Sequence, residues 1–186
     1  MSELFSIQLQ NRQQQGRDGV WLDLPTTTEQ VQAALRQIGI SSDNPQGLFI
    51  SGYFAEEEKR IAIPYNMVLA SNVDELNFLA SRLETLSAGE RAELNAALQA
   101  PQSELFSIGR ITDFPENVDY YVHLPDVRGP AQLGDYYLNR SGMVDMPEEW
   151  KGGIDTAQFG RYVAQQEQGA FTQYGYLVKS GDEWQK

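Results

Sequence analysis

The stretch from Asn72 to Leu98 constrains the fold most, because its pattern predicts two short amphipathic helices in succession. In the first helix, leucines recur at steps of three and four residues, and such steps place side chains on one face of an α-helix. These leucines are Leu76, Leu79, Leu83 and Leu86. Asn72 is a suitable N-cap with Glu75 three residues later, and Ser87 with Glu90 repeats this spacing for the second helix. The stretch therefore predicts a unit that buries leucines and exposes carboxylates.

Before this stretch, the sequence predicts a small sheet with one helix packed on it. The strands are expected at residues 4–9, 20–24 and 48–54. Turn-forming residues at 16–19 connect the first two strands. Thr26 is placed to cap the helix, with Glu29 in the capping-box position. The apolar segment 61–70 is ambiguous, because Pro64 interrupts it.

After a short linker at 100–102, the chain returns to strands and helices. The letters of residues 103–108 repeat those of residues 2–7, which predicts the first strand of a second small sheet domain. Further strands are expected at 118–124 and 174–178, and further helices after Pro130 and Asp155. The last residues, 180–186, are expected to be loose.

Together these elements predict an α+β protein, in which antiparallel sheets with packed helices flank a mainly helical middle domain. A chain of 186 residues is long enough for one to three small domains. The expected domains are a small α+β domain at 1–60, a mainly helical acidic domain at 61–102, and a second α+β domain at 103–186.

The net charge argues against several classes of partner. The chain has 26 acidic and 14 basic side chains, a formal net charge of −12, and residues 51–150 hold seventeen of the acids and seven of the bases. Direct binding of nucleic acid, or of an anionic membrane, needs Lys and Arg instead. No segment is apolar for long enough to cross a bilayer, and the N-terminus lacks a secretory pattern, so we expect a cytoplasmic protein.

The sequence offers few groups for catalysis or metal binding. It has no cysteine and one histidine, His123, so zinc sites and Ser-His triads are hard to assemble. Glycine-rich phosphate loops and the calcium-loop spacing are also missing from the sequence. We therefore expect neither an enzyme nor a cofactor or metal, and a structural role for His123. A hydrolase with a carboxylate pair stays open, and it would place two acids in one concave pocket, at least one with a raised pKa.

Several segments resemble a known protein family, in the right order along the chain. The most specific is Ile154–Arg161, followed by Gly169–Thr172 and Gly175–Tyr176, which resembles the C-terminal signature of the ArdA antirestriction proteins. Gly19–Asp23 resembles their N-terminal domain. Asp74–Ala80, with a glutamate downstream, resembles their acidic central helices.

The resemblance implies an elongated molecule of three small domains that forms a homodimer through its C-terminal domain. Family members mimic bent B-form DNA and occupy the DNA-binding cleft of type I restriction-modification enzymes, on their methyltransferase core. They are carried by mobile genetic elements and need no cofactor. Two departures bear on the strength of inhibition: Tyr162 follows Arg161 where an acid is common, and the C-terminal segment is balanced in charge.

Mimicry requires a density of charge that one helix of this chain cannot supply. Duplex DNA carries one charge per about 1.7 Å of its axis, so one helical turn of about 5.4 Å would need about three carboxylates. The predicted helix from Val73 to Leu86 is more dilute, so several elements, and a pair of subunits, must pool their acids. The acids expected on this surface are Asp74, Glu75, Glu84, Glu90, Glu93, Glu116, Asp119, Asp126, Asp135, Asp145, Glu148 and Glu149.

An acidic adaptor or regulatory protein that binds another basic partner is the alternative to a DNA mimic. The two functions share their surface chemistry and differ in the spacing of the carboxylates. Phosphate-like spacing along a curved line favours mimicry, whereas one local patch favours the adaptor. Aromatic residues of the C-terminal part are expected in the core or, for some, in a dimer interface: Tyr136, Tyr137, Phe159, Tyr162 and Phe171.

Overall fold

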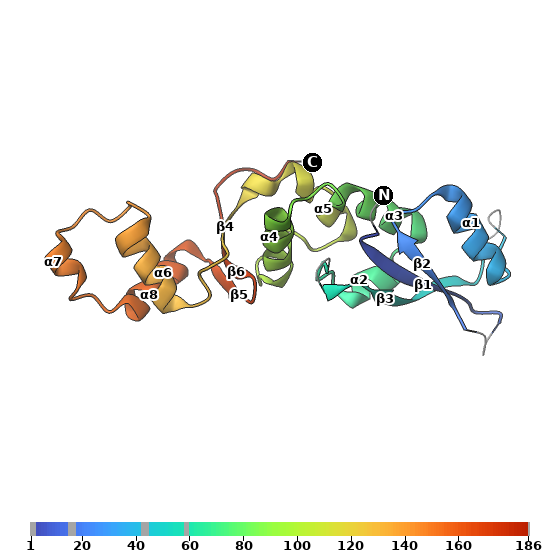
Figure 1. The fold of residues 1–186 in the computed structure, drawn as a ribbon, viewed down its shortest axis with the longest axis horizontal. Helices are drawn as coiled ribbons and strands as arrows, with labels where there is room; N and C mark the ends of the chain where they lie inside the picture. The colour runs from blue at the N-terminus through green and yellow to red at the C-terminus, as the bar shows by residue number, and fades with distance from the viewer. Residues whose placement is uncertain (1–2, 15–17, 42–44, 58–59, 186) are drawn as a thin grey trace. The chain divides into compact units, whose positions relative to one another are not determined.

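The computed structural model describes residues 3–14, 18–41, 45–57 and 60–185. These residues form two small antiparallel sheets with helices, so the predicted α+β class is confirmed (Figure 1). The chain divides into two compact units. Unit 1 comprises Met1–Ser87 and Leu105–Pro115, and unit 2 comprises Ala88–Glu104 and Glu116–Lys186. The three-domain arrangement, with boundaries after residues 60 and 102, stays a prediction.

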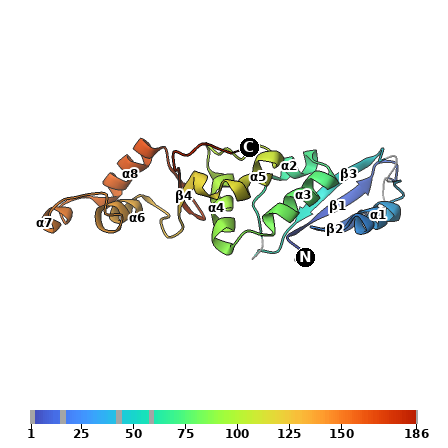
Figure 2. The ribbon, with the colours of Figure 1, turned by 90° about the horizontal axis from the view of Figure 1, so that it is seen from above.

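Unit 1 is built on a sheet with the strand order β2-β1-β3. The strands are β1 (Phe5–Asn11), β2 (Val20–Leu24) and β3 (Leu48–Phe54), and all overlap the predicted segments. Alternate residues of β1, including Phe5, Ile7 and Leu9, are buried, as expected for a strand with one face on the core. Helix α1 (Thr28–Gln37) lies beside β2 (Figure 2). The predicted turn at 16–19 lies partly outside the described residues.

The start of α1 differs from the prediction by one residue, because Thr27 and not Thr26 is the N-cap. The Thr27 hydroxyl accepts a hydrogen bond from the N–H of Gln30 at 3.4 Å, and Gln30 rather than Glu29 completes the capping box. Thr26 bonds elsewhere: its N–H donates to Oδ1 of Asn77 at 2.7 Å, and its carbonyl accepts from Nδ2 of Asn77 at 3.0 Å. One amide side chain therefore joins the residue before α1 to a distant helix.

That distant helix is α3, which has the predicted amphipathic structure. Unit 1 contains α2 (Tyr65–Ala70), α3 (Val73–Leu83) and α5 (Ile108–Thr112). Oδ1 of Asn72 accepts from the N–H of Glu75 at 2.9 Å, which confirms Asn72 as the N-cap. The four leucines predicted on the inner face are buried. The ambiguous segment is resolved because α2 begins directly after Pro64.

The repeated hexapeptide adopts two different structures. Residues 5–7 of the first copy lie in β1, whose two edges are paired with β2 and β3. In the second copy Ser107 caps α5, with its Oγ accepting an N–H three residues later at 3.3 Å. Ile108 and Ile111 are then buried one helical turn apart, and α5 packs against α3. The predicted strand at 103–108 is therefore wrong, because tertiary partners decide the structure of so short a segment.

Unit 2 contains the second sheet, with the strand order β4-β6-β5. Its strands are β4 (Tyr121–Leu124), β5 (Ala170–Thr172) and β6 (Gly175–Lys179). Its helices are α4 (Ala88–Gln99), α6 (Pro130–Asp135), the π-helix η4 (Tyr136–Arg140), α7 (Glu148–Lys151) and α8 (Thr156–Glu167). The 3-10 helix η3 (Val118–Tyr120) occupies the first half of the strand predicted at 118–124, and η2 (Phe114–Glu116) precedes it.

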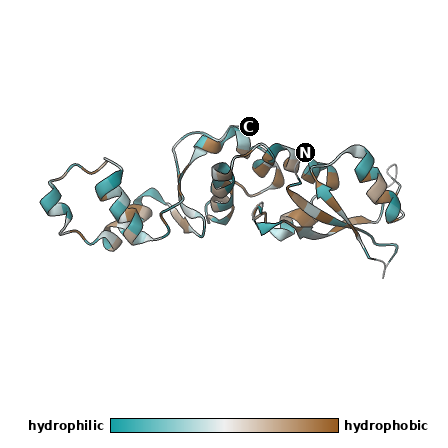
Figure 3. Cartoon of the chain, viewed as in Figure 1, coloured by the Kyte–Doolittle hydropathy of each residue, from teal (hydrophilic) through white to brown (hydrophobic). Residues whose placement is uncertain are grey.

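One hydrophobic core cluster of unit 2 lies among α6, α8 and β6. Val127, Leu133, Ala164 and Tyr176 form its buried cluster. Hydrophilic residues dominate α7, whereas β3 of unit 1 is largely hydrophobic (Figure 3). Of the helices that the structure describes, none has the length and apolar character needed to span a membrane.

Helices α6 and α8 pack closely, because a glycine occupies the contact on each. A Cβ on Gly160 would lie 1.8 Å from the carbonyl oxygen of Pro130, and a Cβ on Gly134 would lie 1.9 Å from the carbonyl oxygen of Thr156. Non-bonded atoms do not approach so closely, so a side chain at either position would push the helices apart. The two helices can therefore pack this closely because Gly134 and Gly160 have no side chains.

The C-terminal residues up to Gln185 are held by contacts, so the expectation of a loose tail is wrong for residues 180–185, and residue 186 lies outside the described residues. The side chain of Asn117 accepts from the N–H of Gln185 at 2.7 Å and donates to its carbonyl at 3.1 Å. Trp184 packs edge-on against Tyr120, with 5.1 Å between ring centroids. A paired amide and an aromatic contact thus fix a segment that is polar in sequence.

Gly160→Ala should destabilise unit 2 by about 2–4 kcal/mol, because the added methyl overlaps a backbone carbonyl that cannot move aside cheaply. Thermal unfolding followed by circular dichroism measures the loss, and hydrogen exchange in α6 and α8 assigns it to this unit. Gly152→Ala is the matched control, because a Cβ there meets nothing within 4 Å. Equal melting temperatures for the two variants would contradict the proposed role of Gly160.

Asn77→Ala should lower the stability of unit 1 by about 1–3 kcal/mol, because it leaves the N–H and the carbonyl of Thr26 without partners. Urea unfolding measured on the fluorescence of Trp21 reports on this unit. Ser81→Ala, an exposed change on the same helix, is the control and should alter stability by less than about 0.5 kcal/mol. A loss no larger than that of the control would show that water replaces both bonds.

Candidate acidic interaction surface

The predicted surface acids all have at least partly exposed side chains. Those with largely exposed side chains are Asp74, Glu75, Glu116, Asp119, Asp126, Asp145, Glu148 and Glu149. Those with partly buried side chains are Glu84, Glu90, Glu93 and Asp135. Exposure is necessary for binding a partner but is common to most acids of folded proteins. The role of these residues in a shared surface therefore stays a prediction.

Three of these acids belong to α3 of unit 1, where local structure accounts for two of them. Asp74 and Glu75 lie in the first helical turn. Carboxylates at that end interact favourably with the partial positive charge of the unpaired amides. Glu84 is the C-cap, and its N–H donates to the carbonyl of Ala80 at 3.0 Å. Asp74 and Glu75 thus stabilise the helix as well as adding negative charge to its surface.

Two acids of unit 2 are countered by a neighbouring cation. Oδ2 of Asp135 lies 3.3 Å from a guanidinium nitrogen of Arg140, and Oε1 of Glu148 lies 2.6 Å from Nζ of Lys151. The opposite charges of each ion pair nearly cancel, so each pair attracts a basic partner only weakly. In the part of the chain that the structure describes, Asp126, Asp145 and Glu149 form no ion pair of this kind. These three carboxylates are better placed to attract a basic surface.

The clearest gathering of acids joins α4 to η3. Glu93 lies on α4 within electrostatic reach of Asp119 on η3 and of Glu90, one helical turn earlier. Oε1 of Glu93 is buried and has no hydrogen-bond partner among the described residues. Desolvation, and then the negative charges of Asp119 and Glu90, raise the pKa of Glu93 to about 7.

The raised pKa of Glu93 has a consequence for charge mimicry. Near neutral pH this side chain is only partly ionised, so the cluster carries less negative charge than its three carboxyl groups suggest. A cation brought close by a partner would favour the ionised form. The 420 Å³ groove of unit 2 is lined by other residues, so the concave pocket that a carboxylate-pair hydrolase requires is not formed there by this cluster.

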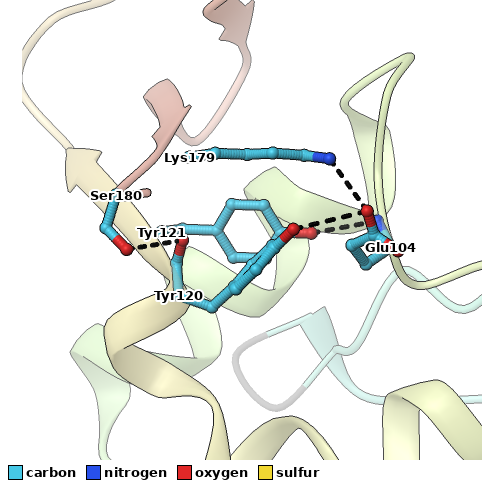
Figure 4. A network of polar contacts seen from close by, with 5 residues as sticks. All are labelled: Glu104, Tyr120, Tyr121, Lys179 and Ser180. Carbon is cyan, nitrogen blue, oxygen red and sulfur yellow. Dashed lines mark hydrogen bonds and ion pairs between the residues drawn. The ribbon is translucent and has the colours of Figure 1, made fainter. Parts of the chain in front are cut away.

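A second polar cluster, which the sequence did not indicate, fixes the segment after α4 (Figure 4). Nζ of Lys179 lies 2.8 Å from Oε1 of Glu104, and the hydroxyl of Tyr120 donates to the same oxygen at 3.3 Å. The N–H of Glu104 donates to the hydroxyl of Tyr121 at 3.0 Å. The hydrogen bond to Glu104 is the main reason why the pKa of Lys179 is raised. This cluster joins residues 75 positions apart, so no local pattern could predict it.

Glu167 forms a third cluster that the sequence did not indicate. Its Oε2 accepts from the hydroxyl of Tyr176 at 2.9 Å, and its Oε1 accepts from the hydroxyl of Tyr137. Burial, and then the hydrogen bond and charge of Glu167, raise the pKa of both tyrosines above the usual range. Glu167 therefore holds the C-terminal turn of α8 against the core of the unit.

The single histidine has a structural contact. Nε2 of His123 lies 2.9 Å from the carbonyl oxygen of Tyr174, in the hairpin between β5 and β6. This bond supports the structural role expected for His123. Among the residues that the structure describes, no group of three acidic or imidazole side chains is arranged to hold a metal ion.

The segments that carry the family resemblance shape the scaffold of unit 2. Oδ1 of Asp155 accepts from the N–H of Gln158 at 2.9 Å and caps α8. Gly160 permits the close contact with α6. Gly175 has a φ of +129° in the turn that enters β6, a conformation that L side chains rarely adopt. The most specific segments of the resemblance therefore contain residues that cap a helix, permit close helix packing or form a turn in unit 2.

The sequence profile described as "Antirestriction protein (ArdA)" matches residues 15–178. The chain belongs to the ArdA family. The match covers most of the chain and confirms the resemblance noted in the sequence. The comparison with curated proteins gives no match. The ArdA family is one of antirestriction proteins rather than a known family of enzymes, and antirestriction is the function that membership implies.

The aromatic residues expected in the core or in a dimer interface differ in their exposure. Tyr162 follows Arg161 on α8 and is 59% exposed, so it does not lie in the core of the chain, and its alternative place in a dimer interface stays a prediction. Tyr136, Tyr137 and Phe171 do pack against the buried cluster of unit 2. A tyrosine side chain therefore faces solvent at this position of α8.

Glu93→Gln should stabilise unit 2 at pH 8 and have little effect at pH 5. The folded state holds the proton of Glu93 more tightly than the unfolded state does, so ionisation costs stability as the pH rises from the ordinary glutamate pKa of 4.5 through about 7. The gain at pH 8 should be about 1 kcal/mol, because the side chain is partly exposed and solvent reduces the full effect.

Chemical denaturation at both pH values measures this difference. Glu149→Gln, an exposed change on α7, is the matched control and should alter stability little at either pH. A gain from Glu93→Gln of the same size at pH 5 and at pH 8 would show that packing, and not ionisation, is responsible.

Proposed function

We propose that this protein is an antirestriction inhibitor that mimics B-form DNA and occupies the DNA-binding cleft of type I restriction-modification enzymes, on their methyltransferase core. Membership of the ArdA family supports antirestriction. The observation that carries the mimicry is the set of exposed carboxylates on several separate elements. Asp74 and Glu75 lie on α3, Asp119 on η3, and Asp126, Asp145 and Glu149 lie in unit 2 without an ion pair among the described residues.

The physical basis of the proposal is distributed electrostatics. A DNA-binding cleft is lined with Lys and Arg that neutralise phosphates, and a protein of net charge −12 can replace DNA there. No single exposed carboxylate contributes much, because water and salt screen it. Inhibition should therefore be shared among many acids and should fall steeply as the ionic strength increases.

The proposal includes assembly and context. We propose that the protein acts as a homodimer through residues 103–186, because the acids of one chain are too sparse to match the charge density of a duplex. It acts in the cytoplasm without a cofactor, and protects the DNA of the mobile genetic element that encodes it. No direct contact with nucleic acid or membrane is required.

An acidic adaptor for another basic partner is the second candidate, and one observation favours it. Glu90, Glu93 and Asp119 form a local cluster instead of an even line, and Asp135 and Glu148 are countered by neighbouring cations. A local patch of this kind suits a compact basic site. The two candidate functions make different predictions. A DNA mimic needs acids outside the Glu90, Glu93 and Asp119 cluster for inhibition, whereas an adaptor that binds through this cluster does not.

A competition assay tests the proposal. A type I methyltransferase is bound to a labelled duplex, the protein is added across a salt series, and the released DNA is measured. The triple variant Asp126→Asn, Asp145→Asn, Glu149→Gln should compete about 10-fold less well at low salt, because three exposed charges are removed. The difference from the wild-type protein should shrink as the salt concentration rises.

The matched control is Glu3→Gln, Asp18→Asn, Glu29→Gln, which removes the same charge from exposed positions outside the predicted surface. It should compete within about twofold of the wild-type protein if location matters more than net charge. Equal loss in the two triple variants would contradict a defined mimic surface. Failure of the wild-type protein to release DNA at low salt would contradict mimicry itself.

A further inference from the structure

A groove of about 420 Å³ lies in unit 2 beside the last residues of β6. One wall is the end of α8, with Ala164 and Glu167, and the other includes Tyr121 and Lys179. Residues 100–102, which follow α4, also line it. The groove is lined by both polar and apolar residues, and nothing in the proposed DNA mimicry uses it.

The backbone of β6 is open on the groove side at Lys179. The N–H of Ser180 donates to the carbonyl of Tyr120 at 2.9 Å, so it points toward β4. The backbone N–H and carbonyl groups of successive strand residues point to opposite edges of the strand. Because the N–H of Ser180 points toward β4, the N–H and carbonyl of Lys179 point toward the side of β5. There the β5 pairing ends at Ala170 opposite Leu177. In the described chain, β5 therefore provides no strand residue opposite Lys179.

The end of α8 explains why β5 starts too late to cover this position. Continuing the register by two residues would place Gln168 opposite Lys179. Gln168 instead has φ 56° and ψ 32° as the left-handed C-cap of α8. A residue in that conformation cannot extend a strand. The groove is thus a strand position that the helix end leaves vacant.

The charge of the groove comes mainly from Glu167. The ammonium of Lys179 is paired with Glu104 at 2.8 Å (Figure 4), so it is already neutralised. The carboxylate of Glu167 accepts hydrogen bonds from two tyrosine hydroxyls, which do not cancel its charge. A basic side chain is the group that complements a carboxylate in such surroundings.

We propose that this groove binds an extended, basic segment of a protein partner. The segment adds a strand beside Lys179, and its backbone pairs with the N–H and carbonyl of that residue. One Lys or Arg side chain of the segment reaches Glu167. The net charge of −12 favours a basic occupant over an acidic one. This interaction goes beyond the proposed occupation of a DNA cleft and does not depend on it.

Amide NMR of the full-length protein tests the proposal. The probe is a capped octapeptide of alternating valine and threonine with one central lysine, and the comparison peptide carries glutamate in its place. The lysine peptide should shift the amide signals of Lys179 and Gly169 and bind about fivefold more tightly than the glutamate peptide. Absence of shifts at millimolar peptide, or equal binding of the two peptides, would overturn the proposal.

Three variants separate backbone pairing from charge. Glu167→Gln should remove the preference for the lysine peptide. Lys179→Ala keeps the backbone N–H and should retain binding, whereas Lys179→Pro removes that N–H and should lose it at least about fivefold. Amide signals elsewhere in unit 2 show that each variant is folded. Equal binding by Lys179→Ala and Lys179→Pro would contradict strand addition.

A second copy of this chain is the other possible occupant, and the same spectra decide it. If the Lys179 and Gly169 signals shift when the protein alone is concentrated, with no peptide present, the groove is a contact between copies and the proposal is overturned. Unchanged signals over a tenfold range of protein concentration support a separate partner.

Discussion

A carboxylate keeps its charge only where water, a hydrogen-bond donor or a cation stabilises it, and this constraint decides which acids of the chain can imitate phosphate. Glu93 shows the limit, because burial and two acidic neighbours raise its pKa to about 7. Asp126 and Glu149 meet the requirement through exposure. In our proposal the interaction surface is therefore assembled from positions that contribute little to the core.

Because charged carboxylates need water, a hydrogen-bond donor or a cation, the residues that form the scaffold differ from those that would bind a partner. Residues of the segment that resembles the ArdA C-terminal signature, such as Asp155 and Gly160, cap a helix or permit close packing. They hold α8 in place and do not present charge to a partner. These residues shape the fold, whereas inhibition in our proposal rests on dispersed acids. Such acids can be exchanged one at a time, because each contributes little.

Much of the fold was predictable because it depends on short-range patterns. The spacing of Leu76, Leu79 and Leu83 predicts a helix with one buried face, and Asn72 predicts where that helix begins. The cap of α1 was misplaced by one residue, because Thr26 and Thr27 are equivalent in sequence. The side chain of Asn77, 51 positions away, engages Thr26 and leaves Thr27 as the cap.

The sequence by itself determined the class of fold, the helical stretch in the middle and the excess of acids, because hydrophobic spacing, capping residues and net charge are local or additive properties. Tertiary structure alone decided that one hexapeptide is a strand in β1 and a helix start at Ser107. It also decided that Glu93 is partly protonated near neutral pH and that Lys179 meets Glu104. These outcomes depend on which distant segments come into contact, and no local pattern contains that information.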